Sequence, residues 1–143
     1  MTDQNQNLNQ EEHDDDMLGD ARMITLATTA NMEIAEKVGN ISLRNQGGFV
    51  AEMHFQFIDS QGNSSRLKGS GRDITLGKSD TRDPGDFGLA DGTLFTVHAR
   101  VKAGDDNTGV LWLRYEKGNR RTARFTICGT TKNNHLGLNG ILA

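Results

Sequence analysis

The stretch "GGFVAEMHFQFID", residues 47–59, is the most regular in this chain and decides the fold class. Its odd-numbered positions from 49 to 57 are apolar, whereas positions 52, 54 and 56 are polar. An alternation of period two is typical of a β-strand that buries one face and turns the other toward solvent. The stretch therefore predicts a strand with Glu52, His54 and Gln56 on its outer face.

Short segments of similar character follow along the rest of the chain, separated by turns rich in Gly, Asn and Asp. The segments expected to form strands are residues 41–45, 72–76, 93–101, 109–115 and 121–128. Residues 80–92 lack a clear period and contain the only proline, so we expect a structured loop there. Short strands with such turns are typical of sandwiches and barrels. The sequence thus predicts an all-β fold over 41–143, either a barrel or a small antiparallel, immunoglobulin-like β-sandwich of two sheets.

Length and composition fit a single domain. The chain has 143 residues, of which 34% are hydrophobic, and no apolar run approaches the ~20 residues of a transmembrane helix. The first 20 residues are polar and acidic, unlike a signal peptide. The lone Cys128 excludes an internal disulfide framework. We therefore expect a protein without a transmembrane segment that is cytoplasmic or released without a classical signal peptide.

Charge is unevenly distributed along the chain. Residues 1–20 hold seven of the 19 acidic residues and no Lys or Arg, so the remainder carries 12 acids against 16 bases. We expect residues 1–20 to be a flexible, acidic, Asn- and Gln-rich tail, disordered or ordered by a partner. Residues 21–40 are expected to form an extension, either a strand or a short helix. The tail is either simply solvated or screens a basic face of its own or a neighbouring subunit.

A cluster of basic residues surrounds the turn "EKGNRR", residues 116–121. Its members are Arg114, Lys117, Arg120, Arg121 and Arg124. Clustered cations attract phosphates and anionic lipids, so the cluster is a candidate patch for an anionic partner. The alternative is a solvated hairpin end. Nucleic acid is disfavoured as a partner because only 6% of the residues are aromatic, and base stacking needs aromatic side chains.

Motifs of known catalytic chemistry do not occur in the sequence. No Ser lies in a nucleophile elbow, and no Gly-rich loop has the spacing that cradles a phosphate. We therefore expect no enzyme and no catalytic residue. Glu52, His54 and His98 could meet and bind a metal if their strands were neighbours, but the spacing favours histidines that face solvent.

Calcium is the one candidate cofactor. Four carboxylates share the loop over residues 80–92, and hard carboxylate oxygens are the ligands that calcium prefers. They belong to Asp80, Asp83, Asp86 and Asp91. Their spacing differs from that of an EF-hand, and Lys78 and Arg82 are alternative partners for them.

Two segments together resemble one family. "NQGGFVAEMHFQFID" (45–59) resembles the strand that opens the C-terminal domain of the cholesterol-dependent, thiol-activated cytolysins, and "LWLRYEKGNRRTARFTICGTTKNN" (111–134) resembles that domain's closing hairpin. The resemblance covers roughly residues 41–135. It implies a small antiparallel β-sandwich and a stand-alone form of the membrane-recognition module that ends those longer pore-forming proteins.

The resemblance also implies candidate loop residues. The family's Trp-rich loop corresponds to residues 107–114, and its sterol-sensing Thr-Leu pair corresponds to Thr131-Lys132. The implied membrane- or ligand-binding residues are Thr108, Val110, Leu111, Trp112, Thr130, Thr131 and Lys132. A lysine stands where the family has leucine, and an ammonium group is costly inside a bilayer, so sterol binding does not transfer with the fold.

Two functions are therefore expected of this chain. The first is a non-enzymatic binding module that recognises a membrane, a lipid headgroup or a glycan through loop tips, within a homo-oligomer. The alternative is a structural subunit that self-assembles into a filament, tube or ring. That subunit would use strand-edge donation and contacts between the acidic tail and a basic face.

Overall fold

The computed structural model describes residues 35–143. The expected acidic tail (1–20) and the expected strand or helix over 21–34 lie outside the described residues. The last part of the predicted extension, 35–40, holds the two-residue strand β1 (Lys37–Val38) and the first residue of β2 (Asn40–Asn45). Among residues 35–143, no helix is long and apolar enough to cross a membrane.

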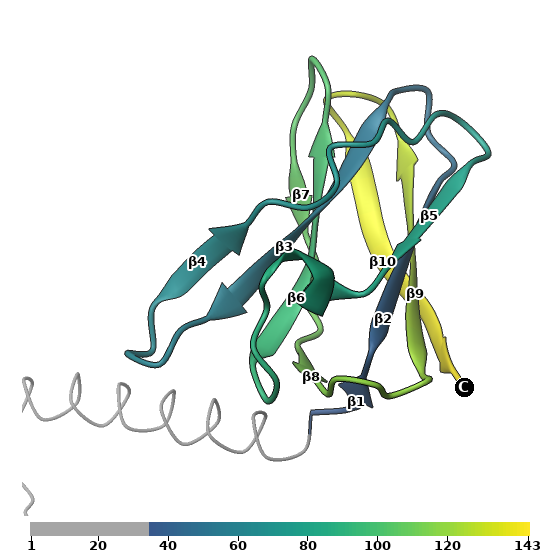
Figure 1. Cartoon of the computed structure of the whole chain (residues 1–143). Helices are drawn as coiled ribbons and strands as arrows, with labels where there is room; N and C mark the ends of the chain where they lie inside the picture. Colours follow the sequence, from purple (N-terminus) through teal and green to yellow (C-terminus); the bar gives the residue numbers. More distant parts are fainter. Residues whose placement is uncertain (1–34) are drawn as a thin grey trace, which may run out of the picture. The chain divides into compact units, whose positions relative to one another are not determined.

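Two sheets face each other (Figure 1), which confirms the predicted all-β sandwich. The first, here called the β3–β6 sheet, has the strand order β1-β8-β6-β3-β4, with β7 also pairing with β6. Its further strands are β3 (Ala51–Ile58), β4 (Ser64–Leu67), β6 (Leu94–Val101), β7 (Asn107–Thr108) and β8 (Leu113–Tyr115). The second, the β2–β9 sheet, has the order β10-β9-β2-β5. It contains β2, β5 (Ser79–Arg82), β9 (Thr122–Gly129) and β10 (Asn134–Leu142).

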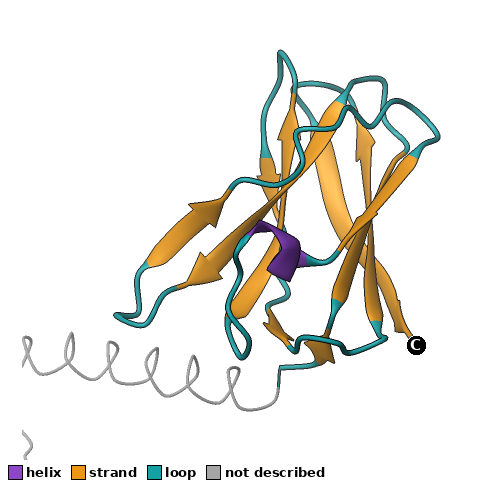
Figure 2. Ribbon diagram, in the orientation of Figure 1, coloured by secondary structure: helices purple, strands orange, loops and turns teal. Residues whose placement is uncertain are grey.

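The sheets are mixed, because β1 pairs with β8 and β2 with β9 in parallel, whereas the other pairs are antiparallel. A short 3₁₀ helix, Pro84–Phe87, lies in the connection between β5 and β6 (Figure 2). The two parallel pairs make the sandwich less uniformly antiparallel than expected. They also bring the first described strands beside segments from the C-terminal third of the chain.

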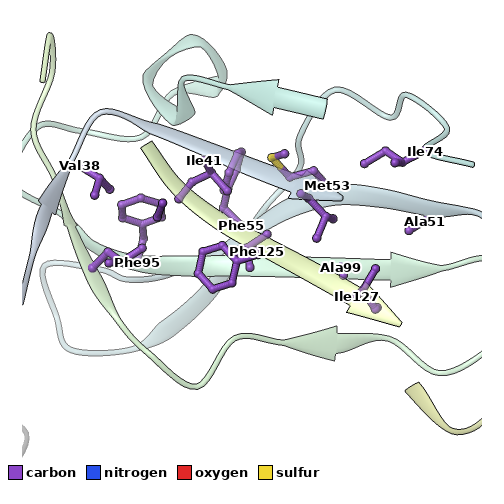
Figure 3. Packing of buried hydrophobic residues seen from close by; sticks show 14 of the residues in the cluster. Val38, Ile41, Ala51, Met53, Phe55, Ile74, Phe95, Ala99, Phe125 and Ile127 are labelled. Carbon is purple, nitrogen blue, oxygen red and sulfur yellow. The ribbon is translucent and has the colours of Figure 1, made fainter. Parts of the chain in front are cut away.

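The core is built from the inner faces of both sheets (Figure 3). Phe55 of β3 packs edge-on against Phe95 of β6, with ring centroids 6.3 Å apart, and Phe95 packs in the same way against Tyr115. From the other sheet, Ile41, Leu43, Ala123, Phe125 and Ile127 close the core. Burying side chains of this kind stabilises a fold by about 1.5–3 kcal/mol each. The apolar face predicted for residues 49–57 is confirmed, with its last member, Phe57, only partly buried.

Some strand predictions were wrong. Residues 72–76 contribute only an isolated bridge from Ile74 to Ala51, and β5 extends from Ser79 into the first three residues of the loop expected over 80–92. The strand expected over 109–115 begins only at Leu113. Both β4 and β10 were missed, because an edge strand with glycines or few apolar residues carries little alternation.

Candidate functional site

A bulge between β7 and β8 forms the most exposed apolar feature of the described domain. Both strands pair with β6, but Thr108 lies opposite His98 and Leu113 lies opposite Phe95. Between these two pairs, β6 has two residues, Thr96 and Val97, whereas the facing segment has four, 109–112. The two surplus residues cannot follow the pleat, and bulges of this kind re-aim side chains outward. Val110 is accordingly 92% exposed and Leu111 45% exposed.

Glycine is required at the start of this bulge. Gly109 donates its N–H to Val97 O at 2.9 Å, and a Cβ on Gly109 would lie 2.4 Å from Thr96 Oγ1. Thr96 Oγ1 is buried and has no hydrogen-bond partner within the described part of the chain. At the other end, Leu113 enters the core and Trp112 is half-buried. The bulge is thus fixed at both ends and presents its middle to solvent.

The second predicted loop, 130–133, connects β9 with β10. Asp105 N donates to Thr131 O at 2.8 Å, and Asn134 Nδ2 donates to Asp105 O at the same distance. Lys132 Nζ lies 3.6 Å from Asp105 on the exposed surface. These contacts join loop 130–133 to the turn over 102–106 at one end of the sandwich, while residues 109–112 lead toward β8 near the other end (Figure 1). The predicted loop residues are therefore divided between two places.

The basic cluster is likewise divided. Arg114 donates to Gly92 O at 2.8 Å, and Arg121 forms a 2.7 Å ion pair with Glu36. Lys117 and Arg120 are exposed on the turn before β9. Arg124 instead lies on the outer face of the β2–β9 sheet and lines a groove with Arg44, a residue that the sequence analysis missed. Of the five basic residues, only Arg124 lines this groove.

Three of the four carboxylates of the calcium hypothesis have separate structural roles, and the fourth, Asp86, lies in the first turn of the 3₁₀ helix. Asp80 forms a 3.0 Å ion pair with Arg82, and Asp91 accepts from Lys117 N at 2.8 Å. Asp83 caps the 3₁₀ helix and accepts from the Tyr115 hydroxyl at 2.5 Å. Within residues 35–143, no group of three or more His, Cys, Asp or Glu side chains has a metal-binding arrangement. The geometry does not support a calcium site.

Asp83 also affects the protonation of its hydrogen-bond partner Tyr115. Burial raises the pKa of the Tyr115 phenol to about 12, and the hydrogen bond and charge of Asp83 add to the rise. The phenol therefore stays a hydrogen-bond donor to Asp83 throughout the neutral range.

The structure does bring Glu52, His54 and His98 together. Strands β3 and β6 are neighbours, and His54 lies directly opposite His98. The expectation of solvent-facing histidines was wrong: Glu52, His54 and His98 are only 7%, 7% and 4% exposed. They are covered because β4 and the segment after it bring Arg66 and Lys68 over this face, and the 102–106 turn adds Asp106.

Each ring nitrogen of the two histidines has a partner. Gly69 N donates to His54 Nδ1 at 2.8 Å, so the His54 proton lies on Nε2, 3.0 Å from Glu52 Oε1. His98 contacts Thr108 Oγ1 through Nδ1 at 2.7 Å and Asp106 Oδ2 through Nε2 at 3.3 Å. Burial lowers the pKa of His98, and the charge of Arg66 lowers it further. The cavity beside them measures about 160 Å³, and no ring nitrogen is left to ligate a metal there.

Comparison with known proteins gives structural matches only. No family model matches the chain, and no curated protein matches it. Among solved structures, the membrane-binding domain of pneumolysin matches 71% of this chain and 96% of its own, with 16% identity and a TM-score of 0.37. The chain resembles the C-terminal domain of the cholesterol-dependent cytolysins.

Longer cytolysin chains match with similar identities and TM-scores. Listeriolysin O is 16% identical over 71% of this chain and 22% of its own, with a TM-score of 0.40. The human-specific toxin intermedilysin is 16% identical over 73% of this chain and 23% of its own, with a TM-score of 0.39. This chain thus spans about a quarter of the length of the complete cytolysins that it matches. The resemblance noted in the sequence is confirmed, and at these identities it concerns the fold.

Proposed function

We propose that the described domain is a non-enzymatic binding module that recognises a membrane surface through the bulge at Val110, Leu111 and Trp112. The observation that carries the proposal is the bulge itself, which turns two consecutive aliphatic side chains into solvent beside a half-buried tryptophan. Grouped exposed apolar residues mark interaction sites, whereas single ones are normal. Tryptophan favours the boundary between apolar and aqueous phases, where its ring is buried and its N–H is hydrated.

The size of the bulge predicts weak, reversible binding. Full burial of a Val or Leu side chain contributes about 1.5–3 kcal/mol, so the pair supplies a few kcal/mol at most. Even a myristoyl chain, which has about twice as many apolar carbons as this pair, anchors a protein only marginally. Several copies in one homo-oligomer would bind more strongly through multivalency, without any new contact.

The buried histidine cluster supports the non-enzymatic part of the proposal. His98 contacts both Thr108 and Asp106, an order of groups that also occurs in hydrolytic triads. In this domain the contacts close the turn between β6 and β7, since Asp106 Oδ1 also accepts from Val101 N at 3.0 Å. The imidazole is 4% exposed, so it lacks the access to a substrate that a general base requires.

Co-sedimentation of the full chain with vesicles tests the proposal. The vesicles are phosphatidylcholine alone, phosphatidylcholine with phosphatidylserine, and phosphatidylcholine with sterol. Trp112 is the only tryptophan, so a blue shift of its fluorescence on binding reports this segment alone. We expect V110S/L111S to weaken binding by 10-fold or more, because both side chains then lose their transfer free energy.

The control is L76S, since Leu76 is 61% exposed at a position outside both the bulge and the groove lined by Arg44 and Arg124. We expect this control to bind like the unsubstituted chain. Equal weakening in both variants, or no binding by the unsubstituted chain to any of the vesicles, contradicts the proposal.

A second candidate, a self-assembling structural subunit, is favoured by one observation. Strand β10 forms a nine-residue edge of the β2–β9 sheet and contains neither a charged residue nor proline. Edges without such residues pair readily with another chain. Native mass spectrometry of the full chain separates the two candidates: a large, open-ended series of species favours the structural subunit, and a monomer or a small closed oligomer favours the binding module.

A further inference from the structure

We propose that the groove on the outer face of the β2–β9 sheet binds a phosphate or sulfate ester, which Arg44 and Arg124 hold between them. The groove has a volume of about 430 Å³ and lies on the four strands of that sheet. The groove shares no residue with the 109–112 bulge. The inference therefore goes beyond the function proposed above and can be tested independently of it.

The parallel pairing of β2 with β9 places the two arginines side by side. Ser42 lies opposite Arg124, and Arg44 lies opposite Thr126. Arg44 and Arg124 are therefore diagonal neighbours on one face, a spacing within reach for long side chains. That face is the outer one, because the alternate residues, such as Leu43 and Phe125, are buried in the core.

Strand β10 makes this face concave. Gly137 lies opposite Thr126 and Gly140 lies opposite Arg124, and a Cβ on either glycine would meet no other atom within 4 Å. The register of β10 shifts between Leu138 and Gly140, which is a bulge that bends the strand. Two missing side chains and a bend leave an open trough where a flat sheet would carry side chains.

The charge of the groove is positive and, among residues 35–143, uncompensated. In this part of the chain no carboxylate lines the groove, and the Arg124 side chain forms no hydrogen bond or ion pair. If the Gln46 amide is oriented so that its oxygen faces Arg44, it accepts from that guanidinium, which carries five N–H donors and so has others left for an anion. Two neighbouring guanidinium groups repel each other, and an anion between them removes that repulsion. Their planar forks suit the oxygens of phosphate and sulfate.

The remaining lining residues favour an esterified anion over a free ion. Polar groups around the arginines come from Ser42, Ser79, Thr126 and Asn139, and Leu142 adds an apolar wall. On the same measure a single water needs only about 10–15 Å³, so the groove has room for a group much larger than one oxyanion. Hydroxyl and amide groups beside the anion site suit the hydroxyls of a sugar or inositol ring.

An NMR titration of the full, ¹⁵N-labelled chain tests the inference. The probes are inositol 1-phosphate, glucose 6-sulfate and phosphatidylcholine vesicles with 10% phosphatidylinositol 4-phosphate. We expect the soluble probes to shift the amide signals of Ser42, Arg44, Arg124 and Gly140. R44E/R124E is expected to weaken their binding at least 10-fold. G140L fills the trough without changing the charge and should weaken binding as well.

The matched control is K117E/R120E, which makes the same change of net charge on the turn outside the groove. We expect it to keep the affinity of the unsubstituted chain. Equal weakening in this control, or shifts that avoid the groove, overturns the inference. If the soluble probes bind, the source is an ester in solution; if only the vesicles bind, and R44E/R124E abolishes that binding, the source is a lipid headgroup. The bulge variant V110S/L111S should not affect the soluble probes, which keeps a failure of either proposal distinguishable from a failure of the other.

Discussion

The outer faces of the two sheets carry polar residues in the same alternating strand positions but use them differently. On the β3–β6 sheet, Glu52, His54 and His98 are almost fully buried and hydrogen-bonded. On the β2–β9 sheet, Arg44 and Arg124 stand at an open groove that no carboxylate lines. The first face resembles a polar extension of the core, and the second is an open, positively charged surface.

The polar residues of the two outer faces differ in burial because different segments of the chain cover the two faces. Residues after β3 fold back as β4 and bring Arg66 and Lys68 over the histidines. Within residues 35–143, no segment comparable to β4 covers the other face, and β10 contributes Gly137 and Gly140 there. A buried polar group is costly unless it is paired, so the covered face had to satisfy its groups internally. On the open face, the side chains of Arg44 and Arg124 are exposed.

Replacing one glycine on each face should give the largest contrast. A Cβ on Gly69 would lie 2.0 Å from Met53 O, and Gly69 N is the donor to His54. A Cβ on Gly140 meets nothing. We expect Gly69→Ala to lower the free energy of unfolding by about 3 kcal/mol, since overpacking and a lost hydrogen bond add together. Gly140→Ala should stay within about 0.5 kcal/mol.

Urea unfolding of both variants, with a common slope, measures the difference. Equal midpoints for Gly69→Ala and Gly140→Ala would mean that the covered face is no more constrained than the open one.

Removing one charged residue from each face should give a smaller contrast. Glu52→Ala leaves the His54 Nε2–H without its acceptor in a buried position, and an unsatisfied buried donor costs about 1–3 kcal/mol. We expect a loss of about 2 kcal/mol. Arg100 and Lys102 also contact Glu52, but both are largely exposed, so their ion pairs add little. Arg124→Ala removes a side chain without a partner and should change stability by less than about 0.5 kcal/mol.

Glu52→Gln is the conservative control, since its amide oxygen still accepts from His54, and it should retain most of the lost stability. A Glu52→Ala protein as stable as Arg124→Ala contradicts the view that the covered face is part of the core.

The fold was largely predictable because its longest central strands carry strong patterns. Strands β3, β6 and β9 each bury one face between the sheets, which leaves clear alternation in the sequence. Edge strands contribute less to the core, and β10 adds two glycines to a partly exposed pattern. The parallel pairing of β2 with β9 joins segments about 80 residues apart, and no local pattern encodes such a partner.

The site was less predictable because it depends on register. Val110 and Leu111 were named from a family resemblance, but their exposure follows from two residues of β6 facing four. Arg44 was missed because only the β2–β9 pairing brings it to Arg124. The burial of His54 could not be inferred from β3 alone, since its cover comes from residues 66–69. In each case the deciding neighbour is distant along the chain.

The pH dependence of stability gives the finest distinction between the two faces. The pKa of His98 lies below its usual value of 6.5, mainly through burial and then through the charge of Arg66, against the opposing effect of Asp106. As the pH falls below about 7, the unfolded chain takes up this proton before the folded chain does. The stability that neutral His98 contributes is therefore complete above pH 7 and is lost as the pH falls through the lowered pKa.

Glu52 also contributes stability that is lost as the pH falls, but over a lower pH range than His98. Burial alone would raise its pKa, but hydrogen bonds and charges from His54 and Arg100 leave it below 4.5, so its contribution is lost only at strongly acidic pH. Urea unfolding between pH 8 and 5.5 should thus show a decline that His98→Gln flattens, because Gln keeps hydrogen-bonding groups but does not titrate. Arg44→Gln, the matched change on the open face, should leave the decline intact. A decline that persists unchanged in His98→Gln would assign the pH sensitivity to groups outside the covered face.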